Sequence, residues 1–363
     1  MSYASSPALR LSNIALARQQ VIEHGTGLSA PLVESWIERS WRRCLSLGHR
    51  PTQTVQFDTV SHTQIRALQE KNQPLLKAAQ NELDRLSRAI SGTRYFALLT
   101  DAQGLVIDTR GEIDHRDSRA SSIARVGVNL SESSVGTTAI GAVLAEQQPI
   151  WLHRGEHFFN DTSVYSCAGA PLWNGQGECI GMLDLTGVMS QERPELMHLA
   201  SLSACSISNA LLLRQPHHLL LRLNWPGRLM GDDHDGLLLL DDEGQVLGAN
   251  LLARDMLNLN KQPQSHASDL FAIPMGLLFD AASHANTMEV PLWSGLHLHV
   301  QAGLQMDCQN ATQPATTGAL QQIQSAVINK AIAHAKGNVA QAAKALGISR
   351  ATLYRKLARK TSH

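Results

Sequence analysis

The side chains best suited to chemistry in this sequence are basic and polar residues near its C-terminus. They follow Lys336 and comprise Asn338, Ser349, Arg350, Thr352, Tyr354, Arg355 and Arg359. Guanidinium groups bind phosphates and guanine edges, and hydroxyl and amide groups bind phosphates or bases. The chemistry that this set predicts is recognition of double-stranded DNA rather than catalysis.

The distribution of charge along the chain supports a polyanionic partner for this segment. The 363 residues contain 31 Lys and Arg and 31 Asp and Glu. No acidic residue follows Asp307, whereas eight Lys and Arg do, so the segment after Asp307 carries +8 and the preceding 307 residues carry −8. A neutral total conceals an acidic body and a basic end, the asymmetry expected of a nucleic-acid-binding C-terminus.

Two short helices are expected to position these side chains. Asn338 and Gln341 form a capping-box pattern at the start of the first helix, whose buried stripe comprises Val339, Ala342, Ala343 and Leu346. Gly347 permits a tight turn, and Ser349 caps the second helix. Leu353 and Leu357 occupy its inner face, leaving outward Arg350, Thr352, Arg355 and Arg359. The pattern predicts a helix-turn-helix whose second helix enters the major groove.

This C-terminal stretch resembles the DNA-binding domain of the Fis nucleoid protein, which is shared by the C-termini of sigma-54-dependent activators. Leu320 to Ala335 is similar to the first helix of that family. The resemblance implies that the seven polar and basic residues named above contact DNA. Ala340 stands where a hydroxyl often serves, and Tyr354 replaces a basic residue, so fewer backbone contacts are expected. The alternative is a solvated basic helix pair.

Upstream, short apolar runs alternate with helical periodicity. Helices are expected at 29–47, with Ser29 as N-cap, and within 61–90, where the spacing from Leu76 to Ile90 indicates either a core face or a dimer seam. The elements expected next are strands at 95–100, 105–109, 149–153, 165–173 and 179–186, with helices at 134–147 and 194–214. This order predicts an α+β domain with an antiparallel sheet flanked by helices.

A second, smaller α+β unit is expected after Pro216. Its expected elements are strands at 236–240, 245–249, 288–293 and 296–303 and a helix at 250–257. We therefore divide the chain into an N-terminal helical segment (1–60), a sensor domain with its leading helix (61–215), a second sensor domain (216–307), a linker (308–319) and the helix-turn-helix (320–363).

The first α+β unit resembles the GAF sensor of acetoin-catabolism and dihydroxyacetone-operon regulators. The resemblance lies in Asn129–Gly141, Gly155–Phe158, Ser166–Pro171 and Gly181–Gly187, with the Ser40–Cys44 run upstream, and residues 216–307 look like the PAS module of that family. It implies that a small-molecule effector binds in the first domain. The candidate ligand-binding residues are Trp151, His157, Phe158, Cys167 and Asp184. For the aromatic members, packing in the core is the alternative role.

One domain of that family has no counterpart here. Such regulators usually carry an AAA+ ATPase between the PAS module and the helix-turn-helix, whereas this sequence has a short linker at that place. No GxxxxGK[ST] motif occurs, so the lysine and backbone cradle for nucleotide phosphates are missing. We expect no ATP-driven activation of sigma-54 polymerase.

Competing chemistry has weaker support in the sequence. His153, His157 and Cys167 could ligate a metal ion, but no fourth ligand is evident, and we predict neither a metal nor a cofactor. The hydrolase motifs GxSxG and HExxH are absent, so we predict no enzyme. Five widely spaced cysteines, no signal peptide and no apolar run long enough to span a bilayer predict a cytoplasmic protein that does not use a membrane.

The sequence is therefore interpreted as a dimeric bacterial transcriptional regulator. Its expected partners are a double-stranded DNA operator, an unknown small effector, a second copy of the chain, and RNA polymerase or a full-length paralogue. Pairing is expected through the helix at 320–335 and through the helix ending at Ile90. The rival hypothesis is a ligand-dependent protein-interaction module with weak, nonspecific DNA affinity. Effector, operator and sign of regulation stay open.

Overall fold

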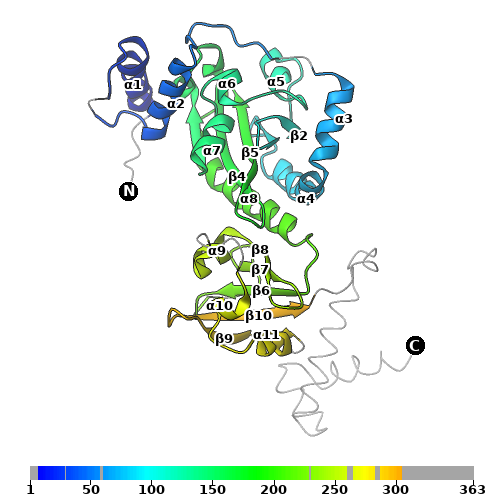
Figure 1. The fold of residues 1–363 in the computed structure, drawn as a ribbon. Helices are drawn as coiled ribbons and strands as arrows, with labels where there is room; N and C mark the ends of the chain where they lie inside the picture. Colours follow the sequence, from blue (N-terminus) through cyan, green and yellow to red (C-terminus); the bar gives the residue numbers. More distant parts are fainter. Residues whose placement is uncertain are drawn as a thin grey trace, which may run out of the picture. The chain divides into compact units, whose positions relative to one another are not determined.

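The computed structural model describes residues 7–28, 30–57, 60–228, 230–259, 265–282 and 287–304. The chain divides into two compact units, Met1–Gln305 and Met306–His363. The predicted linker, the helix-turn-helix and all seven DNA-contacting candidates lie outside the described residues. The first unit contains two five-stranded antiparallel sheets (Figure 1), which confirms the predicted α+β class.

The first sheet carries the residues of the candidate sensor. Its strands, in spatial order, are β2 (Val106–Gly111), β1 (Tyr95–Asp101), β5 (Cys179–Val188), β4 (Tyr165–Trp173) and β3 (Ile150–His153). Every neighbouring pair is antiparallel. The register places Asp184 opposite Leu98 on β1, and Cys167 opposite Thr186. Because side chains alternate along a strand, these four lie on one face of the sheet.

Helices cover both faces of this sheet. On one face, α4 (Gln73–Ala89) and α8 (Leu196–Leu212) bury their apolar stripes against the sheet. The stripe of α4 and Ile90 are buried within the chain, as the core interpretation predicts, and the expectation that they form a seam with a second copy is wrong. The other face is covered by α2 (Ser35–Ser46), α6 (Glu132–Val135) and α7 (Ala139–Glu146).

Short elements complete this half of the unit. The N-terminal helix α1 (Pro7–Arg18) continues into one π-helical turn, η1 (Gln19–Glu23), and α3 (His62–Lys71) precedes α4. Helix α5 (Ser118–Ile123) follows β2. Two 3₁₀ turns, η2 (Arg154–Glu156) and η3 (Asp161–Val164), connect β3 to β4.

Two predicted helices differ from the observed ones. The helix expected from Ser29 begins at Ser35, with Glu34 at its N-cap. The single helix expected at 134–147 is split into α6 and α7 by Gly136, whose φ is +67°. A Cβ at Gly136 would lie 2.8 Å from the Phe159 ring, so only glycine allows the chain to turn there.

The second sheet has the order β8 (Val246–Ala249), β7 (Gly236–Leu240), β6 (Leu219–Asn224), β10 (His297–Leu304) and β9 (Thr287–Pro291). Its central strand, β6, is absent from the sequence-based prediction. Three helices pack against this sheet and share its hydrophobic core: α9 (Leu251–Leu257), α10 (Ala267–Leu270) and α11 (Met275–Ala282). Asn250 caps α9 by accepting from Ala253 N at 2.9 Å.

Candidate functional site

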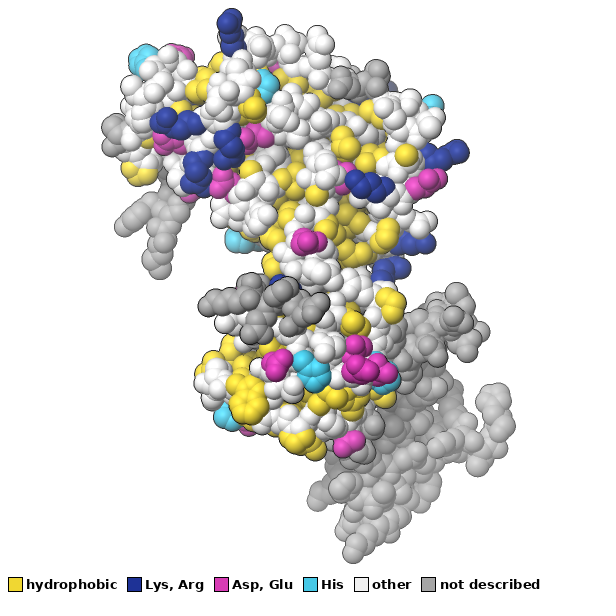
Figure 2. Space-filling view, viewed as in Figure 1, with side chains coloured by type: hydrophobic (Ala, Val, Ile, Leu, Met, Phe, Trp, Pro, Cys, Tyr) yellow, Lys and Arg dark blue, Asp and Glu magenta, His cyan; other side chains and the backbone are white. Residues whose placement is uncertain are grey.

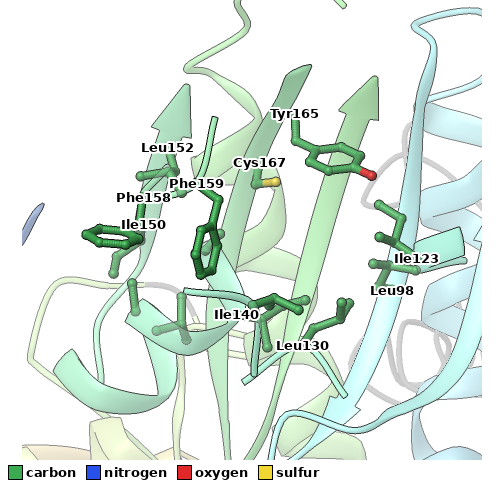
Figure 3. Packing of buried hydrophobic residues seen from close by; sticks show 14 of the residues in the cluster. Leu98, Ile123, Leu130, Ile140, Ile150, Leu152, Phe158, Phe159, Tyr165 and Cys167 are labelled. Atoms are coloured by element: carbon green, nitrogen blue, oxygen red, sulfur yellow. The ribbon is translucent and has the colours of Figure 1, made fainter. Parts of the chain in front are cut away.

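A small cavity lies between the first sheet and the α6–α7 side of the unit. Its volume is about 30 Å³. Its lining combines apolar side chains with a few polar groups: Phe57, Leu98, Ile123, Leu130, Val135, Thr138, Ala139, Ile140, His157, Thr162, Tyr165, Cys167, Asp184 and Thr186. Figure 3 shows several of them, with Tyr165 and Cys167 on one side and Ile123, Leu98, Leu130 and Ile140 on the other. A cavity of this size has room for a group about as large as one or two water molecules.

Asp184 is the unusual residue of this lining. It is fully buried, and its Oδ2 accepts a hydrogen bond from the Thr186 hydroxyl, whereas Oδ1 has no partner among the described residues. Burial raises the pKa of this carboxyl to about 7, although the Thr186 hydroxyl opposes the change. A buried polar atom without a partner is costly, so Oδ1 is the atom in this lining that a bound molecule would satisfy.

His157 presents an acceptor rather than a charge to the cavity. Its Nδ1 lies 2.8 Å from Arg154 O; because a carbonyl only accepts, Nδ1 carries the proton. Burial lowers the pKa of His157 to about 4, and the ring is neutral at physiological pH. Its Nε2 therefore keeps a lone pair, 3.8 Å from Cys167 Sγ.

Cys167 is a protonated, unreactive thiol in this setting. Its Sγ lies 3.4 Å from Thr186 Oγ1, and burial raises its pKa well above the ordinary value, with the Asp184 charge acting in the same direction. Nucleophilic and metal-binding cysteines need the thiolate. The polar groups of the cavity are thus suited to hydrogen bonding with a small molecule, not to covalent catalysis.

The five predicted ligand-binding residues separate into two groups. His157, Cys167 and Asp184 line the cavity together. Trp151 does not, because it packs on the opposite face of the sheet and stacks on His153 at 5.9 Å between ring centroids. Phe158 is also outside the lining; it is fully buried, 5.2 Å from the ring of Phe159. Both aromatics pack in the hydrophobic clusters of this unit, the alternative role that the sequence left open.

The sequence-based prediction missed several lining residues. Thr186 has a signal in the sequence, since it follows Asp184 by two positions on one strand and must share its face. Tyr165 has the same relation to Cys167 on β4. Phe57 and Ile123 come from a loop and from α5, and no local pattern connects them to the sheet.

Metal ligation finds no support in the part of the chain that the structure describes. There, no group of three or more His, Cys, Asp or Glu side chains could hold a metal ion. His153, the third member of the candidate set, instead has its Nδ1 2.6 Å from Ser166 Oγ. Among the same described residues, no helix has the length and apolar character needed to cross a membrane.

Two protein families match different parts of this chain. Residues 319–359 match the family described as bacterial regulatory protein, Fis family, and residues 12–209 match the MimR N-terminal domain. The second match covers more than half of the chain. This chain belongs to the MimR N-terminal domain family. Together with the Fis-type match at the C-terminus, this assignment confirms the predicted family.

Individual relatives are also regulators. The acetoin catabolism regulatory protein of Cupriavidus necator is 30% identical over 252 residues, covering 66% of this chain and 38% of that protein. The propane 2-monooxygenase operon transcriptional activator MimR of Mycolicibacterium smegmatis is 29% identical over 198 residues, covering 54% and 32%. The chain therefore spans less than two-fifths of the length of either relative. The DhaR(N)–DhaL complex of E. coli aligns with a TM-score of 0.46 at 16% identity, over 76% of this chain and 100% of that one.

The MimR N-terminal domain includes a polar clamp between α2 and the wall of the cavity. Ser40 Oγ lies 2.6 Å from a Glu132 carboxylate oxygen and 2.8 Å from Thr137 Oγ1. Arg43 donates through Nε to the same carboxylate at 2.6 Å. This gives the Ser40–Cys44 run, singled out from the sequence, a structural role: it holds the segment that leads into α7.

A second clamp joins α1 to the opposite wall. The Arg18 guanidinium donates to the carbonyl oxygens of Gly155, His157 and Phe158 at 2.9, 2.5 and 2.9 Å. Arg10 pairs with the buried Glu156 at 2.8 Å. The N-terminal helices of the MimR domain thus hold the segment that carries His157.

Several basic side chains of this domain are paired with acidic ones. Arg39 and Arg43 both contact Glu146, and Arg42 pairs with Glu38 at 2.8 Å. On the face drawn in Figure 2, dark-blue and magenta side chains accordingly lie next to one another near α2. The excess of positive charge instead lies in the Fis-type segment, where the sequence places it.

Proposed function

We propose that this regulator binds a specific DNA operator through its Fis-type segment and that a small molecule in the cavity changes this binding. The match of residues 319–359 to the Fis family supports the first part and carries the proposal. The unpartnered, buried Oδ1 of Asp184 in a cavity supports the second. An effector that prefers one conformation of the protein shifts the equilibrium toward it.

The lining of the cavity restricts the chemistry of the effector. Asp184 Oδ1 has no partner among the described residues, His157 Nε2 has only the contact with the Cys167 thiol, and the remaining lining is largely apolar. A compact molecule that donates a hydrogen bond fits this arrangement, whereas a negatively charged one does not, since the lining contains no Lys or Arg and His157 is neutral. Ligand binding by His157, Cys167 and Asp184 is thus part of the proposal, whereas Trp151 and Phe158 are excluded from it.

The DNA-binding part assigns roles to residues of the second predicted helix. We place Arg350, Thr352 and Arg355 in the major groove, with Asn338, Ser349, Tyr354 and Arg359 as further contacts. Two copies are needed, because one helix-turn-helix contacts too little DNA for high specificity. No step uses ATP, since the given sequence has no phosphate-binding loop.

Footprinting and binding titrations test this function. The full chain is footprinted on genomic fragments, and the protected site is then compared with random DNA for the wild type and for Arg350→Ala. If Arg350 reads a guanine edge, the variant loses about 1 to 3 kcal/mol on the operator and little on random DNA. His363→Ala, near the end of the same segment, serves as control. Equal losses on both DNAs would contradict base reading, and no protected site at any protein concentration would contradict operator binding.

A further inference from the structure

A larger outer pocket lies next to the cavity and shares part of its wall. The volume of the outer pocket is about 470 Å³. Three residues line both spaces: Phe57, Thr162 and Tyr165. These side chains therefore form the partition between the cavity of Asp184 and the outer pocket.

Two members of this partition are fixed by hydrogen bonds. Thr162 Oγ1 donates to Phe159 O at 3.0 Å, and the Tyr165 hydroxyl donates to Arg119 O at 3.1 Å. The third member, Phe57, has an apolar, half-buried side chain on a segment without helix or strand. Displacing Phe57 breaks no side-chain hydrogen bond, so it is the member of the partition that moves most easily.

The backbone that carries Phe57 is attached to the rim of the outer pocket. Asn160 N donates to Pro51 O at 2.9 Å, and Val55 N donates to an Asp161 carboxylate oxygen at 3.2 Å. These bonds keep the backbone of 51–55 in place beside η3. A rotation of the Phe57 ring would therefore not require these backbone hydrogen bonds to break.

We propose that small molecules reach the cavity from the outer pocket past Phe57, which acts as a gate and limits the size of the effector. This inference rests on the proposed function, in which the cavity is the effector site. Phe57 is a specificity-determining residue in this scheme. A bulkier side chain closes the partition, and a smaller one opens it.

Cys167 provides a reporter for this route that needs no knowledge of the effector. Its Sγ lines the inner cavity and not the outer pocket, whereas the buried Cys44 lines neither. The probe is methyl methanethiosulfonate, a small reagent whose sulfur is attacked by the thiolate to give a methyl disulfide and methanesulfinate. The full chain is treated under mildly alkaline conditions, and the modification of each cysteine is followed by peptide mass spectrometry.

In the wild type, we expect Cys167 to react no faster than Cys44, because burial keeps both thiols protonated and the partition is closed. Phe57→Ala should raise the ratio of the two rates by about tenfold, because it removes a half-buried ring whose displacement costs about 1.4 kcal/mol. Phe57→Trp should lower the ratio. Leu32→Ala is the matched control: Leu32 is also a half-buried loop residue packed on the same core, but it lines neither space, so its variant should leave the ratio unchanged.

Several results would contradict the proposal that Phe57 acts as a gate. They are a ratio of the Cys167 rate to the Cys44 rate that is the same in the wild type and in Phe57→Ala, a ratio that Phe57→Trp raises, or the same increase in Leu32→Ala. Normalisation to Cys44 separates gate opening from unfolding, and Phe57→Trp keeps the test decisive if Phe57→Ala folds poorly. Because the reagent is not the effector, failure here leaves the effector proposal standing. A working gate without any effect of small molecules on DNA binding would instead refute the proposed function alone.

Discussion

Replacement of Asp184 by asparagine should change how the stability of the protein depends on pH. In the folded chain, burial raises the pKa of Asp184 to about 7 from its ordinary value of 3.8. A carboxyl whose pKa is raised by folding gives its full stability below the unfolded pKa, and this stability is lost as the pH rises through the folded pKa. The wild type should therefore lose stability between about pH 4 and about pH 8.

The magnitude follows from the two pKa values. The difference between 3.8 and about 7 corresponds to about 4 kcal/mol, since one pKa unit is worth about 1.4 kcal/mol. Asparagine does not titrate, so the free energy of unfolding of Asp184→Asn, relative to the wild type, should increase by about 4 kcal/mol from about pH 4 to about pH 8. The prediction concerns only how the difference in unfolding free energy between the two proteins changes with pH. Any pH-independent destabilisation caused by the asparagine amide therefore cancels.

Denaturant unfolding at a series of pH values measures this difference. Thr186→Val is the matched control, because it keeps the carboxyl and removes the hydroxyl that lowers its pKa. That variant should lose more stability than the wild type as the pH rises. A difference between Asp184→Asn and the wild type that stays constant over the whole pH range would refute the assignment of a raised pKa to Asp184.

Two further substitutions test how the cavity walls are held. Arg18→Ala should lower the free energy of unfolding by about 2 to 4 kcal/mol, because three carbonyl oxygens lose a charged donor; thermal unfolding measures this, and a variant as stable as the wild type would show that the clamp contributes nothing. Gly136→Ala should cost about 3 kcal/mol, because a φ of +67° and the nearby Phe159 ring both oppose a Cβ. Gly276→Ala, where a Cβ would meet open space, should be close to neutral in the same assay, and equal effects of the two glycine variants would contradict the steric explanation.

The sequence predicted those elements whose signal is local. The hairpin of β1 and β2, the pair β4 and β5, and helix α8 were expected close to their observed bounds, because turn residues and apolar periodicity mark them. Strand β6 was missed although Leu219, Leu221 and Leu223 alternate as buried residues. Its flanking strand β10 is about 75 residues further along the chain, and an isolated six-residue run does not reveal its partners.

The sequence predicts some of the residues of the candidate site that lie on strands. A carboxylate between Leu183 and Leu185 on an apolar strand is a visible anomaly, and Asp184 was selected from the sequence. Trp151 was selected as well, yet the face of the sheet on which a residue lies depends on strand register and packing. The contribution of Phe57 depends on a loop that returns to the sheet after α2, and long-range packing of this kind leaves no pattern in a single sequence.

The clamp formed by Arg18 has a consequence for how this sensor can change. The guanidinium binds carbonyl oxygens of the main chain, which every residue type possesses, rather than the side chains at 155, 157 and 158. The attachment through Arg18 is therefore independent of side-chain identity at these three positions. Position 157 can be substituted, and the hydrogen-bonding character of the cavity altered, while the wall remains fixed to the N-terminal helix. A substitution at 157 can thus change the ligand that the cavity prefers without removing the hydrogen bonds that Arg18 donates to the main chain.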